Sequence, residues 1–375
     1  TQNLFKIPFT RDKSMLFDGT DDFVQFALPT VFNDIGSNDF SVSLWVNSDN
    51  LSLASPYTRI FEAAYDNVTF AQFNIREAGK PSFYVREGGS HYASVVDSAL
   101  DTGQWYHLVG VWDASENSAK LYLDGVLQSG TGGNLDAGWG GVQNAFLGCR
   151  GGASAFSDGS LDEVSIFSSA LTAREVDALY NNGQPTNLSS YSTLDHWYRM
   201  GEGKLGTKRD GESNLLFDQG PNGGLGSEKI SDGGFGDYAN WLRLGDAVVE
   251  NGVGTFPTST SNSFIIAEGA VPATVAVYKL QYDIVSTNGN TLQLAGGSSA
   301  FPTTALASSV GTHSVFVTSN GTKTNLQFNN GASFVGSIDN VSLKEVQNVG
   351  TLVNSPAIQA DGGTELVTNG TFDTD

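Results

Sequence analysis

The sequence predicts an all-β fold made of tandem antiparallel β-sandwiches, with one short helix closing the first. Glycine supplies 45 of the 375 residues and charged residues make up only 16%, a composition typical of short strands joined by many turns. Apolar and polar side chains alternate in short runs separated by Asp-Gly and Asn-rich turns. Such alternation is typical of antiparallel hairpins, whose apolar faces need a second sheet to cover them.

The clearest hairpins lie between residues 15 and 168. The alternating run 105–112 turns through 113–117, continues as 119–123 and turns again at Asp124-Gly125. Because this pattern repeats over about 150 residues, we expect residues 1–186 to form one sandwich with two packed sheets.

The helix is predicted at residues 171–180. Apolar side chains recur near one helical face at Leu171, Val176, Leu179 and Tyr180. Thr172 and Glu175 have the spacing of a capping box, and Asn-Asn-Gly at 181–183 is a stop signal. We therefore expect a short helix that packs against the sandwich and closes the domain.

Three motifs in the first 186 residues resemble the laminin G/concanavalin A-like family. They are Asp-Gly-Thr-Asp-Asp-Phe-Val at 18–24, the Trp-His run that leads to Leu-Tyr-Leu-Asp-Gly within 101–127, and Gly-Ser-Leu-Asp-Glu-Val-Ser-Ile-Phe at 159–167. Their order matches the family, whose last strand is followed by a terminal helix. The resemblance implies a jelly-roll sandwich and does not by itself assign a function.

The remainder divides into three predicted segments. Residues 187–225 resemble the strand and loop that precede a laminin G-like domain, and we expect them to be a connector that pairs with a neighbouring sheet. Residues 226–346 are again rich in alternating runs. They end in Ile-Asp-Asn-Val-Ser-Leu at 338–343, which resembles the final strand of carbohydrate-binding-module jelly rolls.

An internal repeat defines the last segment. Residues 227–235 align without gaps to residues 364–372, with Glu, Gly and Phe identical. The offset is the length of one jelly roll and a linker, so 347–375 are predicted to be a linker and the start of a third module. On this interpretation the chain is part of a longer array.

The charge balance and the single cysteine exclude several classes of protein. The net charge of −21 repels phosphates, which argues against nucleic-acid binding and against attachment to anionic membranes. Cys149 alone allows neither a disulfide framework nor a cysteine-based zinc site. No apolar run approaches the roughly 20 residues that span a bilayer, so no membrane insertion is expected.

Catalytic motifs are missing from the sequence, so we predict that the protein is not an enzyme. Glycosidases on this type of sandwich carry paired carboxylates on one strand face, and no Glu-x-Asp-x-x-Glu run occurs. Asp162 and Glu163 are adjacent, which in a regular strand places them on opposite faces. His107 lies in an alternating strand, where packing is the expected role.

Clustered aspartates suggest structural calcium, which prefers carboxylate and carbonyl oxygens. Related sandwiches hold calcium between an N-terminal loop and the last strand, and the resemblance points to corresponding positions in both predicted domains. The candidates are Asp18, Asp21, Asp22 and Asp162 in the first domain, and Asp232 and Asp339 in the second. The alternative is that these residues only form turns and bond to their own loops.

Sugar recognition needs an aromatic platform beside polar side chains. The candidate ligand-binding residues are Trp139, in a glycine-rich loop, and Tyr92, Tyr238 and Trp241. For each of them, packing inside the fold is the alternative.

Together these features predict a non-enzymatic protein that binds cell-surface or polymeric carbohydrate. By analogy with phage fibres and appendages, we expect a virion-surface structural or adhesion protein that contacts other virion subunits and forms a homo-oligomer. Two alternatives remain: an extracellular or cell-surface adhesin, or the accessory region of a polysaccharide-degrading enzyme. A purely structural spacer or capsid decoration is a further possibility.

Overall fold

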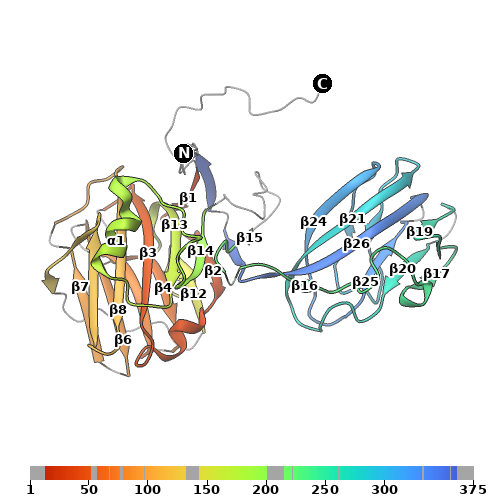
Figure 1. Cartoon of the computed structure of the whole chain (residues 1–375). Helices are drawn as coiled ribbons and strands as arrows, with labels where there is room; N and C mark the ends of the chain where they lie inside the picture. Colours follow the sequence, from red (N-terminus) through yellow and green to blue (C-terminus); the bar gives the residue numbers. More distant parts are fainter. Residues whose placement is uncertain are drawn as a thin grey trace, which may run out of the picture. The chain divides into compact units, whose positions relative to one another are not determined.

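Figure 1 shows the computed structural model of the chain. The structure describes residues 13–51, 57–66, 68–76, 79–88, 90–96, 98–131, 143–200, 215–221, 223–259, 262–331, 333–354 and 356–360. It divides into two compact units: unit 1 comprises Thr1–Gly224 with Asn348–Asp375, and unit 2 comprises Leu225–Gln347.

Unit 1 contains two antiparallel sheets. In the first, the strand order is β10-β9-β8-β3-β13-β1-β28, and β14 pairs with β13. The bounds are β10 (Val126–Leu127), β9 (Ser118–Leu123), β8 (Trp105–Asp113), β3 (Phe40–Ser48), β13 (Asp158–Phe167), β1 (Lys13–Asp18), β28 (Ala357–Ala360) and β14 (Leu194–Tyr198).

The second sheet of unit 1 has the order β11-β7-β6-β5-β4-β12-β2-β27-β15. The bounds are β11 (Gly130–Thr131), β7 (Ser90–Val95), β6 (Lys80–Glu87), β5 (Phe70–Arg76), β4 (Tyr57–Ala64), β12 (Asn144–Leu147), β2 (Phe23–Ala27), β27 (Gly350–Val353) and β15 (Leu215–Leu216).

The main core of unit 1 lies between these two sheets. Alternate residues of each strand point inward, so that Val42 and Leu44 of β3 share one apolar cluster with Phe73 of β5 and Phe83 of β6. Gly110 of β8 lets the sheets approach closely, because a Cβ atom there would collide with the Phe83 ring. The alternating pattern of the sequence therefore produces the face-to-face sandwich that it predicts.

The predicted helix is confirmed as α1 (Ala173–Tyr180), which follows β13 and lies over the outer face of the first sheet (Figure 1). The capping box forms as expected, with Thr172 Oγ1 accepting from the Glu175 N–H and Glu175 accepting from the Thr172 N–H. Asn181 ends the helix in the left-handed conformation and begins the 3-10 turn η3 (Asn181–Gly183). No helix of the described residues is long and apolar enough to cross a bilayer.

Unit 2 is a second sandwich with its own core. Its larger sheet has the order β18-β19-β26-β21-β24, with β16 on β26, and its smaller sheet the order β17-β20-β25-β22-β23. The bounds are β18 (Val248–Glu250), β19 (Val253–Phe256), β26 (Gly336–Gln347), β21 (Val277–Thr287), β24 (Gly311–Thr318), β16 (Gly224–Glu228), β17 (Leu242–Leu244), β20 (Phe264–Ala267), β25 (Leu326–Asn329), β22 (Gln293–Leu294) and β23 (Thr304–Ala305).

The all-β, jelly-roll fold class is confirmed. The predicted connector 187–225 pairs with neighbouring strands as expected, β14 with β13 and β15 with β27. The segment after unit 2 differs from the prediction. The predicted linker 347–375 contributes β27 to one sheet of unit 1 and β28 to the other. The chain thus returns to unit 1 after unit 2. β27 and β28 have four residues each, which is too short for their alternation to be recognised in sequence. The predicted repeat at 364–372 lies outside the described residues.

Candidate functional site

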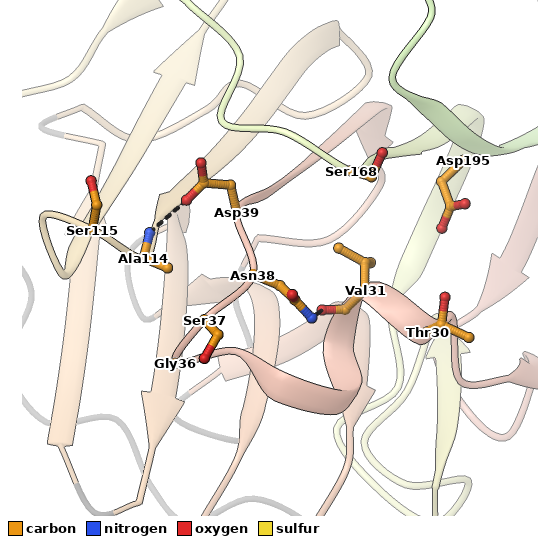
Figure 2. A pocket seen from close by; sticks show the side chains of 10 residues that line it. All are labelled: Thr30, Val31, Gly36, Ser37, Asn38, Asp39, Ala114, Ser115, Ser168 and Asp195. Carbon is orange, nitrogen blue, oxygen red and sulfur yellow. Dashed lines mark hydrogen bonds between the residues drawn. The ribbon is translucent and has the colours of Figure 1, made fainter.

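A polar cavity of about 600 Å³ opens on unit 1 (Figure 2). It lies where the 3-10 turn η1 (Thr30–Asp34), the turn after β8, the end of β13 and the beginning of β14 come together. The lining residues are Thr30, Val31, Gly36, Ser37, Asn38, Asp39, Ala114, Ser115, Ser168 and Asp195. The volume falls within the range of about 300–1,000 Å³ typical of small-ligand sites.

Local hydrogen bonds hold the loop that forms one wall of this cavity. Asp39 Oδ1 accepts from the Ala114 N–H at 2.9 Å, and Asn38 Nδ2 donates to the Val31 carbonyl at 3.2 Å (Figure 2). Gly36 lies against the Glu87 carboxylate, and a Cβ atom there would displace this side chain. The wall is therefore positioned by the protein itself, which reduces the ordering cost of binding.

Hydroxyl, amide and carboxylate groups dominate the lining, and no lysine or arginine is among the lining residues. Asp39 and Asp195 supply two carboxylates that accept hydrogen bonds when ionised, while Asn38 and the serines both donate and accept. This set suits a neutral molecule with many hydroxyl groups, and it disfavours an anion.

A histidine and two carboxylates lie at the Asp195 side of the cavity. His196 Nδ1 is 3.1 Å from Asp195 Oδ2, and its Nε2 is 3.8 Å from Asp218 Oδ2. Burial raises the pKa of Asp218 to about 6, although His196 and the N–H groups of Trp197 and Gly220 oppose the shift. This cluster fixes β14 and the loop that follows it, and so places Asp195.

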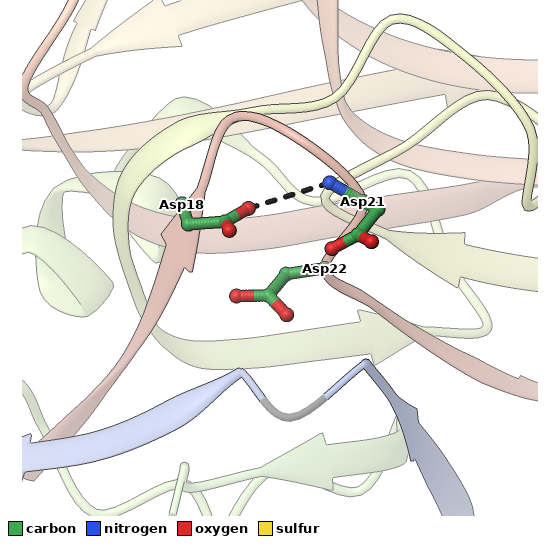
Figure 3. A group of neighbouring side chains, drawn as sticks. All are labelled: Asp18, Asp21 and Asp22. Carbon is green, nitrogen blue, oxygen red and sulfur yellow. Dashed lines mark hydrogen bonds between the residues drawn. The ribbon is translucent and has the colours of Figure 1, made fainter.

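The three N-terminal aspartates come together as the sequence predicted (Figure 3). One ligand atom from each of Asp18, Asp21 and Asp22 lies within 4.8 Å of the others. Asp18 Oδ1 accepts from the N–H groups of Thr20 and Asp21, which lowers the pKa of Asp18. Burial, together with the neighbouring charges of Asp18 and Asp21, raises the pKa of Asp22. Three convergent carboxylates, one of them buried, are a donor set that fits calcium.

Asp162 does not join this cluster, contrary to the prediction. The register of β1 on β13 places Asp18 opposite Asp158, four residues earlier. Asp158 lies against Gly19, and its pKa is raised by burial and by Asp49 and Asp18. Asp162 is 1% exposed and accepts from the N–H of Glu163 at 2.7 Å. The register decides the outcome, because strand pairing sets which residue faces the loop.

A bulge in β13 also changes the predicted relation of Asp162 to Glu163. The register of β13 on β3 shifts between Asp162 and Ser165, and Glu163 has a φ of 49°. Glu163 Oε2 accepts from Trp197 Nε1 at 2.5 Å, and its Oε1 accepts from Arg199 Nε at 3.2 Å. Both carboxyl groups are thus buried and bonded within the fold rather than presented to a substrate.

In unit 2, each predicted calcium ligand accepts backbone hydrogen bonds from its own segment, Asp232 in a turn and Asp339 within β26. Asp232 accepts from the N–H groups of Gly236 and Asp237 at 2.8 Å each. Asp339 Oδ1 accepts from the N–H of Asn340 at 2.6 Å, and it lies 4.0 Å from the position of a Cβ atom on Gly234. The Asp232 contacts are those that the turn-forming alternative expects, and calcium binding in unit 2 stays a prediction.

The four aromatic candidates have different surroundings. Trp139 lies outside the described residues. Tyr92 is half-buried and packs on Trp112, with ring centroids 4.9 Å apart. Tyr238 is 65% exposed, and the Arg243 guanidinium lies over its ring.

The sequence predicts that Trp241 lines a ligand cleft. The structure places most of its ring in the core of unit 2, and Trp241 also lines a small pocket of about 170 Å³ beside Asp232 and Asn240. It is 1% exposed, packs on Phe235 and donates from Nε1 to the Asp232 carbonyl. The turn after Phe235 folds the ring inward, because burying a large aromatic group with its N–H bonded is favourable.

A second group of polar side chains lies on the face of the β4-β5-β6 sheet that points away from the core. It consists of Arg59, Glu62, Gln72, Asn74 and Ser82, all at most 1% exposed. Arg59 and Glu62 form an ion pair, and burial lowers the pKa of Arg59 to about 9. Since these groups are fully buried, they do not offer the open surface that the cavity offers.

The sequence did not indicate the cavity residues or Asp158. Ser37, Asn38 and Asp39 are ordinary turn residues in sequence, and Ser168 and Asp195 are more than 120 residues away from them. The polar run 36–39 is a signal of an exposed turn, but it does not indicate which distant residues lie beside it. Asp158-Gly159 is likewise a turn signal next to the last strand.

Comparisons with known proteins agree with the fold of unit 1. Residues 18–177 match the family model Laminin_G_3, described as the concanavalin A-like lectin/glucanases superfamily. No curated protein matched the chain.

Among solved structures, a heptameric SAP-like pentraxin from Limulus polyphemus is 20% identical, with a TM-score of 0.36, over 46% of this chain and 84% of its own. A putative carbohydrate binding protein from Bacteroides ovatus is 17% identical, with a TM-score of 0.39, over 56% of each chain. The CBM40 of a Ruminococcus gnavus sialidase, bound to sialyllactose, is 14% identical, with a TM-score of 0.34, over 46% of this chain and 99% of its own.

Residues 18–177 are therefore similar to concanavalin A-like domains of the laminin G type, and their strand order is that of a two-sheet sandwich. The TM-scores of the three solved structures are all below 0.5, so this assignment rests on the family model and on the strand order. Unit 2 is a further jelly-roll sandwich, outside the matched residues.

Proposed function

We propose that the protein binds carbohydrate without transforming it, and that the polar cavity of unit 1 is the binding site. The observation that carries this proposal is the lining of that cavity, where hydroxyl, amide and carboxylate groups surround about 600 Å³. The similarity of residues 18–177 to the concanavalin A-like lectin/glucanases superfamily supports it. The absence of basic residues from the lining points to a neutral sugar rather than a sialic or uronic acid.

Non-enzymatic binding is proposed because the adjacent carboxylates of the last strand, Asp162 and Glu163, are bonded within the fold. Asp162 accepts from the Glu163 N–H, and Glu163 accepts from Trp197 and Arg199. A glycosidase needs two carboxyl groups that flank the scissile bond. These two face the interior of the fold and are held by protein donors.

The test fills the cavity with a bulky side chain. Ser37 is exposed on the cavity rim, so Ser37→Trp should block the site and abolish binding on a glycan array of neutral sugars. Asn33→Trp is the matched control, because Asn33 is exposed in the neighbouring 3-10 turn and does not line the cavity. Unchanged binding by Ser37→Trp, with circular dichroism like the wild type, would exclude this site.

We also propose that calcium occupies the Asp18, Asp21 and Asp22 cluster. The ion would neutralise like charges that otherwise repel one another, and it would join the end of β1 to the start of β2. Its proposed role is structural.

As the setting of this binding we propose display on a virion appendage, within a multimodular fibre or decoration. The acidic, nearly cysteine-free composition and the two sandwiches in one chain support this proposal. A bacterial surface adhesin or the accessory region of a polysaccharide-degrading enzyme would use the same cavity. The genes adjoining the full-length coding sequence distinguish these settings. Capsid or tail genes beside it would support the virion appendage. A catalytic domain encoded in the same gene would support the accessory region of an enzyme.

A further inference from the structure

The polar cavity of unit 1 offers a ligand more hydrogen-bond acceptors than donors. The Ser115 hydroxyl donates to Asp113 Oδ1 at 2.8 Å, and the Ser168 hydroxyl donates to the Thr193 carbonyl at 3.2 Å. Asn38 uses one of its amide hydrogens on a carbonyl of the η1 turn. Because a hydroxyl has a single hydrogen, the two serine oxygens can only accept from a ligand.

Two carboxylates from separate elements add to this surplus of acceptors. Asp39 precedes β3 and Asp195 lies in β14, and both line the cavity (Figure 2). The Ala114 N–H donates to Asp39 Oδ1 and so fixes the position of this carboxylate. His196 Nδ1 is 3.1 Å from Asp195 Oδ2, but His196 is not among the lining residues. Since the lining contains no lysine or arginine, it holds negative charge without a balancing cation.

Most of the charged side chains in the turns around the cavity are also acidic. Asp34 is exposed in the η1 turn, Asp113 ends β8, and Glu116 lies in the turn that follows. Lys120 is the basic group here, and its Nζ is 3.5 Å from Glu116 Oε2. A cleft lined by one sign of charge raises the local concentration of ligands of the opposite sign. The surroundings therefore favour a ligand with a positive group.

We infer that the sugar bound in this cavity carries a free amino group, as in a hexosamine unit without an acetyl group, within an otherwise neutral glycan. This inference rests on the carbohydrate site proposed above and specifies its ligand class. A protonated amine has three donors and no acceptor, which complements a lining rich in acceptors. It also places a positive charge near Asp39 and Asp195, where a hydroxyl group places none. The remaining sugar hydroxyls both donate and accept, as do those of Thr30 and Ser37 in the lining.

The experiment compares glycans that differ only in one substituent. The probes on one array are oligosaccharides of glucosamine, N-acetylglucosamine and glucose with the same linkage, together with the corresponding galactose series. The full chain should bind the amino member of a series about tenfold more tightly than the hydroxyl member, because opposite charges about 4 Å apart near a protein surface attract strongly. This preference should decrease at high salt, which screens the attraction.

The outcomes separate this inference from the proposed function. Equal binding of the amino and hydroxyl members, or binding only of glycans without an amino group, would overturn the inference and leave the carbohydrate site in place. Binding of no glycan would overturn both.

Asp39→Asn tests whether the cavity carries the recognition of the amine. The amide oxygen can still accept from the Ala114 N–H, so the loop should stay in place while the charge is lost. The amino preference should fall about threefold or more, since Asp195 keeps its charge, and binding of the hydroxyl member should persist.

Asp34→Asn is the matched control. Asp34 is exposed in the neighbouring η1 turn and does not line the cavity, so the same charge is removed outside the site. This variant should keep most of the amino preference. A preference that is the same in Asp39→Asn as in wild type would overturn the inference, because the amine would then be recognised elsewhere.

Discussion

Ser43 Oγ lies 2.8 Å from His107 Nε2 in a fully buried site beneath α1. The imidazole packs against the rings of Trp45 and Tyr180. Glu163 and Ser165 of β13 face the same small space, and Leu179 of α1 helps to close it. Burial lowers the pKa of His107 to about 3, so this histidine is a neutral packing residue, as its place in an alternating strand predicted.

Acid should destabilise unit 1 through His107. Its pKa in the folded state, about 3, lies below its ordinary value of 6.5. The unfolded chain therefore binds a proton that the folded chain does not, and the free energy of unfolding falls as the pH is lowered below 6.5. His107→Gln keeps a polar partner for Ser43 and should flatten this dependence in urea titrations between pH 6.5 and pH 3. His313→Gln, in unit 2, is the control, and an unchanged slope in His107→Gln would refute the prediction.

Asp218 should stabilise the folded chain at acid pH, whereas His107 destabilises it there. The folded-state pKa of Asp218, about 6, lies above its ordinary value of 3.8, so the folded chain holds the proton more tightly. The stabilisation is present below pH 3.8 and is lost as the pH rises through 6, by about 3 kcal/mol at 1.36 kcal/mol per pKa unit.

Asp218→Asn tests this expectation. An amide oxygen can still accept from the N–H groups of Trp197 and Gly220, so the loop should remain in place. At pH 7 the variant should be at least as stable as wild type, with a smaller loss of stability between pH 4 and pH 6.5. A variant that is less stable than wild type at both ends of this range would show that the charge is needed for folding.

Calcium should raise the melting temperature of unit 1. A ligand that binds only the folded state stabilises it by about 2.7 kcal/mol at one hundred times its dissociation constant. Asp21→Asn removes one carboxylate of the cluster and should reduce the shift, whereas Asp101→Asn, exposed and outside the cluster, should not. Differential scanning calorimetry with calcium and with excess chelator measures the effect, and identical melting curves would exclude the ion.

Gly110→Ala should destabilise the sandwich. A Cβ atom at this position meets the Phe83 ring of the opposite sheet, and overpacking of this kind costs about 1–3 kcal/mol. Gly297→Ala is the control, since a Cβ atom there has no neighbour within 4 Å. Urea unfolding of both variants gives the comparison, and equal midpoints would mean that the sheets have room to separate.

Only part of the calcium cluster could be predicted from the sequence. Asp18, Asp21 and Asp22 are close in sequence, and their grouping follows from one turn. Choosing Asp158 rather than Asp162 requires the register of β1 on β13, which short alternating runs do not determine. Trp241 was similarly ambiguous, because a tryptophan after a turn can fold inward or outward.

The sequence by itself determined the alternating strands, the capped helix at 171–180 and the acidic, cysteine-poor character of the chain. These are local properties, set by side-chain period, capping residues and composition. Tertiary structure alone decided that β27 and β28 rejoin unit 1, that Asp158 faces Asp18, and that Asn38, Ser168 and Asp195 share one cavity. Those contacts join residues far apart in the chain, and their geometry is fixed by strand pairing and packing between sheets rather than by any neighbouring residues.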